Sequence, residues 1–218
     1  DFSMAPGVAK TFCKEYFKAL GQYLNARWGL EYGQGQEIAG QAKAQVGADI
    51  AMSSQVAYGE KMAPWLAARP ELTGIDLPEA QKAHRRSVET ALAETDRASY
   101  QAMEALVHNL NTMNSRAGAQ VPFSSINYGT DTSEQGRMVM RNLLLATEAG
   151  LGDGETPIFP VQIFKVKEGI NYNPEDPNYD LFKLAMRVSA KRLFPNFSFI
   201  DAPFNLQYYK KGDYDTEI

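Results

Sequence analysis

The sequence predicts an α/β protein in which a helical layer precedes about three mostly parallel strands with crossover helices. Strand and helix patterns alternate regularly over residues 116–218, which is typical of a parallel sheet. Residues 1–115 show helical periodicity without that alternation. We therefore expect two parts: a helical segment, residues 1–115, and a strand–helix segment, residues 116–218.

Composition and charge exclude several classes of protein. The chain has 218 residues, of which 44% are hydrophobic and 22% charged, with a formal net charge of −4. This length can bury a substantial core, while the slightly acidic balance offers no basic surface for DNA or RNA. No apolar run approaches the roughly 20 residues that a membrane helix requires. We expect a cytoplasmic protein that binds neither nucleic acid nor membrane.

The helical half is dominated by two long predicted helices, Pro6–Arg27 and Pro78–Asn114. Between them, Glu37–Ala68 favours helix with interruptions near Ala48–Ser54 and at Pro64. The two long helices each carry an apolar stripe, so we expect them to pack together and to present a face for oligomer formation. The stripe of the second helix consists of Val88, Leu92, Thr95, Ser99, Met103, Leu106, Leu110 and Met113.

The strand–helix half is organised around Val121–Ala149. It opens with a predicted strand, Val121–Tyr128, which Gly129 ends. Asp131 and Glu134 have the spacing of a capping box, so a helix is predicted over Thr132–Ala149. Further strands are predicted over Thr156–Val166 and Asn196–Ile200, with a helix over Tyr179–Leu193 between them. We expect these strands to be parallel, with right-handed crossovers.

Ser125 and Asn127 are polar at positions where a core strand usually carries aliphatic side chains. Both share one parity of the strand and therefore one face of the sheet. They suit a polar cavity at the carboxyl ends of parallel strands. Alternatively, they hydrogen-bond the turn at Gly129. The sequence pattern leaves both interpretations open.

Few other residues suggest chemistry. The single cysteine, Cys13, excludes an internal disulfide and lies in a predicted helix, where we expect a buried structural thiol. His84 and His108 are the only histidines and lack cysteine partners, so we expect solvated or capping side chains and no metal site. GQGQEIAG follows no strand, so we expect a loop there and not a dinucleotide fingerprint. The pattern assigns no catalytic residue.

Three stretches strongly resemble the anaerobic (class III) ribonucleoside-triphosphate reductases: DFSMAPGVAKTF, AGAQVPFSSINYGTDT, and the long run from GRMVMRNLLLATEAGLGDGETPIFPVQIFKVKEG to AKRLFPNFSFIDAPFNLQYY. The resemblance covers nearly the whole chain and is weakest over residues 29–78. It implies an interior fragment of the catalytic subunit of a glycyl-radical enzyme that reduces ribonucleoside triphosphates to deoxyribonucleoside triphosphates for DNA synthesis. The implied fold is part of a ten-stranded α/β barrel.

The resemblance also implies which residues carry the radical chemistry, and none of them falls in this sequence. Family members use a thiyl-forming cysteine on a hairpin loop, a second cysteine on an early strand, a radical-storing glycine and a four-cysteine zinc site. Cys13 matches none of these positions, and Gly150, Gly152 and Gly154 lie outside the radical-loop context. We expect the fragment alone to be inactive and to bind no cofactor. The alternative is a non-catalytic nucleotide-binding or interaction module derived from the same fold.

The implied partners follow from the family. They are the remaining segments of the catalytic subunit, a second copy in a homodimer, a radical S-adenosylmethionine activating enzyme with an iron–sulfur cluster, and ribonucleoside triphosphates. Zinc and the nucleotide effectors ATP and deoxyribonucleoside triphosphates complete the complement, with formate or a thiol as reductant. Ser125 and Asn127 are the expected wall of the substrate cavity. The two long helices are the candidate location for effector binding.

Overall fold

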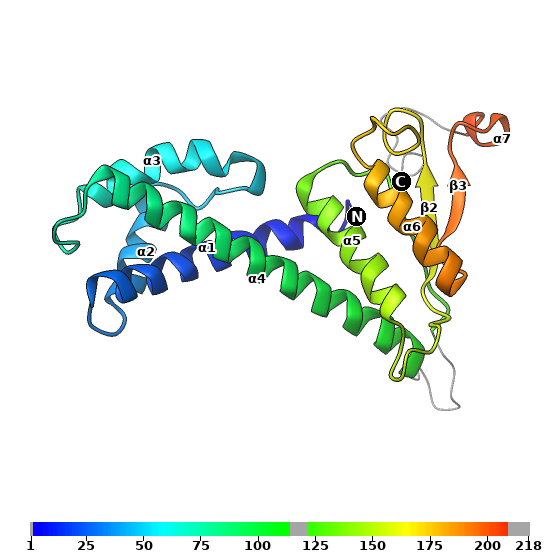
Figure 1. Ribbon diagram of the computed structural model, residues 1–218, viewed down its shortest axis with the longest axis horizontal. Helices are drawn as coiled ribbons and strands as arrows, with labels where there is room; N and C mark the ends of the chain where they lie inside the picture. Colours follow the sequence, from blue (N-terminus) through cyan, green and yellow to red (C-terminus); the bar gives the residue numbers. More distant parts are fainter. Residues whose placement is uncertain (1, 114–121, 209–218) are drawn as a thin grey trace. The chain divides into compact units, whose positions relative to one another are not determined.

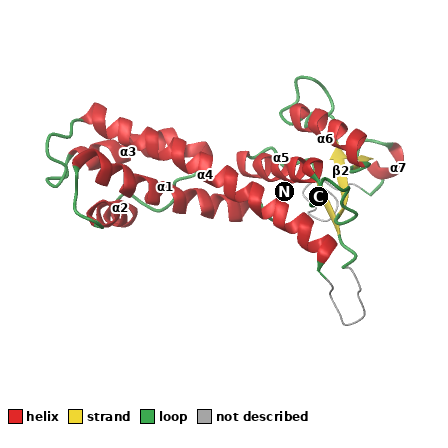
Figure 2. Cartoon of the chain, turned by 60° about the horizontal axis from the view of Figure 1, so that its bottom comes forward, coloured by secondary structure: helices red, strands yellow, loops and turns green. Residues whose placement is uncertain are grey.

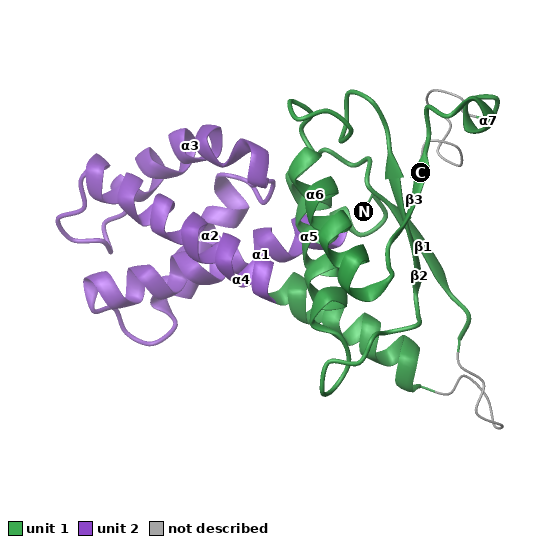
Figure 3. Ribbon diagram, turned by 45° about the vertical axis from the view of Figure 1, so that its right-hand side comes forward, with its two compact units in different colours: residues 1–6, 98–218 green, residues 7–97 purple. Residues whose placement is uncertain are grey.

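The computed structural model describes residues 2–113 and 122–208, and its element order is shown in Figure 1. The chain forms two compact units, one of residues 7–97 and one of residues 1–6 with 98–218 (Figure 3). The boundary at residues 97 and 98 falls inside the long helix α4 (Leu77–Thr112). The predicted division at residue 115 lies outside the described residues.

Helices make up the unit of residues 7–97 (Figure 2). The predicted packing of the two long helices is confirmed: in α1 (Ala5–Trp28) the Tyr16 hydroxyl lies 2.8 Å from Nδ1 of His84 in α4. Arg27 and Glu79 form an ion pair between the same helices at 3.5 Å. The fully buried large side chains of this unit are Tyr16, Phe12, Leu20, Leu24, Met62, Leu66 and Leu72.

Two predictions about the middle of this unit are wrong. The expected loop at GQGQEIAG is helical from its second residue, since α2 spans Gln34–Gln45. Gly35 allows α2 to pack closely against α1, because a Cβ at this position would lie 2.2 Å from the carbonyl oxygen of Gly21 in α1. The expected interruption at Pro64 is also absent, because α3 (Gln55–Ala67) continues through that residue. A short 3-10 turn, η1 (Met52–Ser54), precedes α3, where an interruption was expected.

The second unit contains the predicted parallel sheet, with strand order β1-β2-β3. The strands are β1 (Ser125–Tyr128), β2 (Val161–Val166) and β3 (Asn196–Phe199), and both neighbouring pairs are parallel. The helices between them, α5 (Glu134–Ala149) and α6 (Tyr179–Arg192), lie on the same side of the sheet (Figure 3). A one-turn helix, α7 (Pro203–Leu206), follows β3. The structure is thus mixed α/β, as predicted.

The strands are shorter than predicted, and β2 shows why. The backbone between the predicted start at Thr156 and the observed start is bonded to α4 and not to the sheet. Oδ1 of Asn111 accepts hydrogen bonds from the N–H groups of Ile158 and Phe159 at 2.8 and 3.0 Å. Pro160 then lacks an N–H for the sheet. The strand therefore begins only at Val161. For β1, the predicted first residue, Val121, lies outside the described residues.

Both ends of α5 are fixed by hydrogen bonds. Ser133, not the predicted Asp131, is the N-cap, and its side chain accepts from the N–H of Gly136 at 3.1 Å. At the other end, the guanidinium of Arg192 donates to the carbonyls of Glu148 and Ala149. That buried guanidinium satisfies carbonyls that the last turn of the helix leaves without partners, and it joins the end of α6 to the end of α5.

One face of the sheet is buried beneath α5 and α6. The ring of Phe164 in β2 lies 5.5 Å from Tyr128, 6.0 Å from Phe197 and 6.2 Å from Phe182 of α6. Gln162, a polar interruption of β2, is buried on the same face between the Tyr128 hydroxyl, which donates to it at 2.7 Å, and Thr147 of α5, to which it donates at 2.8 Å. Every buried polar group of this side chain thereby finds a partner.

Gly129 ends β1 in a conformation that only glycine adopts readily. Its φ is +131°, and a Cβ there would lie 2.4 Å from the carbonyl oxygen of Lys165 in β2. The absence of a side chain therefore allows β1 to turn directly against the neighbouring strand.

We expect Gly129→Ala to lower the free energy of unfolding by more than about 2 kcal/mol, because the added methyl group meets backbone that cannot move aside. Gly169→Ala is the matched control: Gly169 also has a positive φ, +79°, but nothing lies within 4 Å of its added Cβ. That control should cost about 1 kcal/mol. Urea denaturation of both variants measures the difference, and equal losses would show that the close approach at Gly129 contributes nothing.

Candidate functional site

The face of the sheet opposite α5 and α6 carries Ser125 and Asn127, the two residues that the sequence assigns to a cavity wall. Both side chains are exposed. The strand register pairs Asn127 with Ile163 of β2, and Ile163 with Asn196 of β3. Because paired residues of neighbouring strands share a face, the structure brings polar side chains from different strands onto one surface. We call this surface the open face; it consists of Ser125, Asn127, Val161, Ile163, Lys165, Asn196 and Ser198.

The open face becomes more polar toward the carboxyl ends of the strands. Ser125 is paired with Val161, whereas the next row contains Asn127 and Asn196 on either side of Ile163. Lys165 and Ser198 form the last row. Ligands of parallel sheets bind at the carboxyl ends of the strands. This arrangement offers amide, hydroxyl and ammonium groups there.

Sequence reasoning missed the two asparagines that hold this end of the sheet. Asn171 is fully buried; its Nδ2 donates to the carbonyls of Gly129 and Lys165, both at 2.9 Å, and its Oδ1 accepts from the N–H of Lys167 at 2.9 Å. Asn178 is also fully buried, and its Nδ2 donates to Gly129 at 3.2 Å and to the carbonyl of Asp131 at 2.9 Å. The only sequence signal was a cluster of asparagines and prolines in the loop after β2.

Lys165 is the cationic member of the open face. Burial lowers the pKa of its ammonium below the ordinary value, because a half-buried charge loses part of its hydration. A partly desolvated cation interacts more strongly with an approaching anion than a fully hydrated one does.

A separate hollow of about 340 Å³ lies where β2 and β3 end, and it is lined in part by acidic side chains. Two of its lining residues, Glu168 and Asp201, are carboxylates. Asp201 pairs with Lys167 at 3.2 Å and accepts from the N–H of Glu168 at 2.7 Å. A polyphosphate is therefore a poor ligand for this hollow, since like charges repel.

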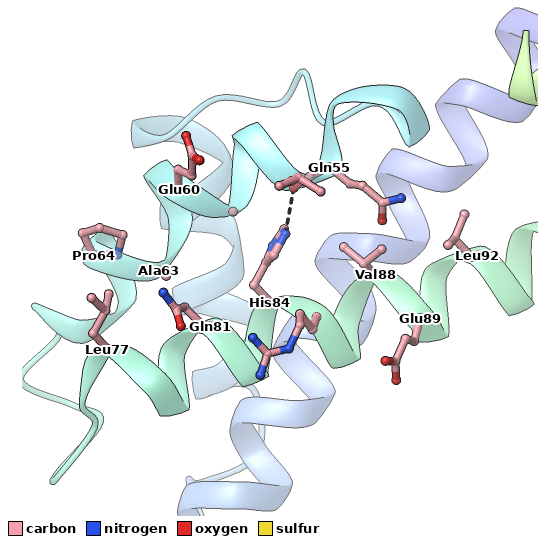
Figure 4. Close-up of a pocket in the computed structure, with 13 residues that line it drawn as sticks. Gln55, Glu60, Ala63, Pro64, Leu77, Gln81, His84, Val88, Glu89 and Leu92 are labelled. Atoms are coloured by element: carbon pink, nitrogen blue, oxygen red, sulfur yellow. Dashed lines mark hydrogen bonds between the residues drawn. The ribbon is translucent and has the colours of Figure 1, made fainter.

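The helical unit contains a larger groove of about 560 Å³ between α3 and α4 (Figure 4). Its lining is mostly apolar, with charged side chains of Glu60, Arg85 and Glu89 among the residues around it. His84 is among the lining residues, and its Nε2 lies 2.9 Å from the carbonyl oxygen of Gln55, the bond drawn in Figure 4. No serine, threonine, cysteine or lysine is among its lining residues, and the apolar lining suits a contact surface better than a reaction centre.

The prediction that His84 is solvated or capping is wrong. Its side chain is 7% exposed and lies between the Tyr16 hydroxyl and the Gln55 carbonyl. Gly59 makes room for it, because a Cβ at that position would lie 2.6 Å from Cδ2 of the imidazole. Burial lowers the pKa of His84 below its ordinary value, so the ring is neutral near pH 7.

Cys13 and the remaining potential ligands form no chemical centre in the described part of the chain. Cys13 is half-buried in α1, and its Sγ donates to the carbonyl of Ala48 at 3.0 Å. Burial raises the pKa of its thiol, which disfavours the nucleophilic thiolate. Across residues 2–113 and 122–208, no three His, Cys, Asp or Glu side chains lie together as metal ligands. Nor is any helix of these residues long and apolar enough to cross a membrane.

Comparison with known proteins identifies relatives of the chain. The sequence model of a family described as anaerobic ribonucleoside-triphosphate reductase matches residues 1–217. Enzymes of that name align over 107 residues, 49% of this chain, with 40% identity in Enterobacteria phage T4, 36% in Haemophilus influenzae and 34% in Escherichia coli. The aligned stretch spans 18% of the phage protein and 15% of the two bacterial ones.

The buried, neutral state of His84 predicts that stability falls in mild acid. Its folded pKa is depressed, so the unfolded chain binds more protons below the ordinary pKa of about 6.5. The free energy of unfolding should therefore decrease from about pH 7.5 to about pH 5.5. His84→Gln should be less stable at the higher pH and should lose less on acidification, whereas His108→Gln should behave as the unaltered chain. An identical pH dependence in all three proteins would contradict the neutral, buried assignment.

We expect Asn171→Ala to destabilise the sheet, because it removes the side-chain hydrogen bonds to the Lys165 carbonyl and the Lys167 N–H and leaves the Gly129 carbonyl with Asn178 as its asparagine donor. At about 1–3 kcal/mol for each buried group that loses its bond, the loss should be at least about 2 kcal/mol. Asn173→Ala is the control in the same loop, since that amide side chain forms no hydrogen bond with the described part of the chain; it should cost less than about 1 kcal/mol. Chemical denaturation followed by circular dichroism measures both, and similar losses would show that the Asn171 bonds are not decisive.

Proposed function

The chain belongs to the anaerobic ribonucleoside-triphosphate reductase family, and from this premise we propose that it forms part of the catalytic subunit of such a reductase. That enzyme reduces ribonucleoside triphosphates to deoxyribonucleoside triphosphates by glycyl and thiyl radical chemistry. In this proposal the sheet contributes three strands of a ten-stranded α/β barrel, and the rest of the subunit supplies the others.

The observation that carries this proposal is the open face. Parallel sheets are normally covered on both faces by apolar packing, yet here one face buries an aromatic cluster while the other displays Ser125, Asn127 and Asn196. A polar face of this kind suits the wall of a barrel that holds a polar substrate. We propose that Ser125 and Asn127 contact the nucleotide there by hydrogen bonds.

In this proposal, the residues of this chain bind and orient the nucleotide and do not carry the radical. Thiyl chemistry requires a sulfur held against the ribose, and Cys13 is unsuited to supply it because it lies in α1, protonated and bonded to Ala48. A glycyl radical, made by a radical S-adenosylmethionine activating enzyme, supplies the oxidising power in the proposed complete reductase. The described residues do not fit the zinc site of the family, since they bring no ligand set together.

The helical unit suggests a role in assembly and regulation. Its groove between α3 and α4 presents apolar side chains such as Val56, which is 77% exposed, and Leu77, which is 46% exposed. We propose that this unit contributes to a homodimer interface and to binding of ATP or deoxyribonucleoside triphosphate effectors, in a cytoplasmic enzyme. The apolar lining supports burial against another surface.

The proposal predicts that Asn127→Ala lowers turnover in the complete reductase that carries this segment. The loss of one substrate hydrogen bond should reduce kcat/KM for CTP about tenfold, and Ser125→Ala should act in the same direction. Asn109→Ala, an exposed position on α4, is the control and should leave turnover unchanged. Formation of dCTP by the activated enzyme is the measurement. Full activity of Asn127→Ala would remove β1 from the substrate wall, and absence of turnover in the unaltered enzyme would refute the reductase assignment.

A further inference from the structure

Lys165 occupies a distinctive position on the open face. It lies on the central strand β2, one row beyond Ile163 toward the carboxyl end, and it is paired with Ser198 of β3. Its neighbour on the β1 side is the turn at Gly129, which has no side chain. An ammonium group therefore stands at the carboxyl end of the sheet with glycine on one side and a small hydroxyl side chain on the other.

Among the residues that the structure describes, this ammonium has no counter-ion. The ion pairs of the described residues use Lys167, with Asp201 at 3.2 Å, and place no carboxylate within 4.0 Å of Lys165. Its side chain is half-buried, and desolvation alone accounts for the lowered pKa of its ammonium. Partial burial of a cation without a carboxylate partner costs free energy. An anion from outside the chain would offset that cost by pairing with the ammonium.

The surroundings of Lys165 narrow the class of anion. Successive residues on one face of a strand are separated by about 6.6 Å and neighbouring strands by about 4.8 Å. Lys165, Ser198, Asn127 and Asn196 therefore occupy a patch roughly 10 Å across that combines one cation with hydroxyl and amide donors. Such a patch matches an extended anion with several oxygen atoms better than a single carboxylate. Phosphate oxygens accept from lysine and from neutral donors at the same time.

We propose that Lys165 binds the triphosphate group of the ribonucleotide, while Asn127 and Asn196 contact the parts of the nucleotide nearer the middle of the open face. This inference rests on the proposed function for the identity of the nucleotide, but the anion site itself is defined by the residues of the sheet. It gives the substrate a direction along the strands, with its phosphates toward the carboxyl ends of β2 and β3. The acidic hollow beyond those ends, with Glu168 and Asp201, sets the limit of the phosphate site.

Binding to the 218-residue chain tests the anion site without any turnover. The ligands are CTP, inorganic tripolyphosphate and cytidine, which separate the nucleotide, the phosphate chain alone and the nucleoside. We expect CTP and tripolyphosphate to shift the NMR signal of the Lys165 side chain, and cytidine to leave it unchanged. Isothermal titration should show about tenfold weaker binding of CTP and tripolyphosphate to Lys165→Gln, near-normal binding to Lys165→Arg, and normal binding to Lys191→Gln, an exposed charge-matched control on α6.

The outcomes separate this inference from the reductase assignment. Equal CTP affinity in the unaltered chain and in Lys165→Gln, or an unshifted Lys165 signal at saturating tripolyphosphate, would overturn the phosphate site even if the complete reductase forms dCTP normally. Lys165-dependent binding of both phosphate ligands would support it even if the complete protein proved to have no reductase activity. Because the NMR shift is read in the unaltered chain, a folding defect in a variant cannot hide the answer.

Discussion

The carboxyl end of the sheet depends on two buried asparagine side chains. Asn171 bonds the ends of β1 and β2 at once, through the carbonyls of Gly129 and Lys165, and Asn178 adds the carbonyl of Asp131 immediately before α5. The carbonyls of Gly129 and Asp131 follow the end of β1, and the Lys165 carbonyl lies near the end of β2, at a level that β1 no longer reaches. Buried carbonyls without partners would be costly, so the loop after β2 supplies the bonds. The same loop leads into α6, whose N-cap is Asn178 itself. Strand ends, turn and helix start are thus fixed together.

This constraint explains how one sheet can have two unlike faces. The helices α5 and α6 cover the side that holds Phe164, and the hydrogen bonds of Gln162 to Tyr128 and Thr147 fix that side in register. Register determines the opposite face as well, because successive side chains alternate. Once Phe164 is inside, Ile163 and Lys165 must point to the open face. The position of the proposed phosphate-binding lysine therefore follows from the packing of its aromatic neighbour.

Local pattern was sufficient to predict the parallel sheet and to place Ser125 and Asn127 on one face, because period-two alternation and strand–helix order are local signals. It failed where the partner is distant in sequence. The start of β2 was predicted too early because the side chain of Asn111 in α4 hydrogen-bonds the backbone that precedes the strand. The burial of His84 was missed because its partner Tyr16 is 68 residues away in sequence. Gly35 was taken for a loop residue although its role is close contact with Gly21. Lys165 was visible in the sequence as a charged residue in an otherwise apolar strand. Its role could be proposed only once the structure showed which residues of β1 and β3 share the open face with it.

The strand order has a consequence for the isolated chain. Among the described residues, β1 and β3 are the outer strands, so each has a row of backbone N–H and C=O groups with no ladder partner on its outer side. Phe123 beside β1 is 91% exposed, and Phe199 in β3 is 48% exposed. Unprotected edge strands with adjacent apolar side chains are templates for pairing with other chains. In a barrel those edges would be closed by neighbouring strands, but free in solution they would promote concentration-dependent self-association.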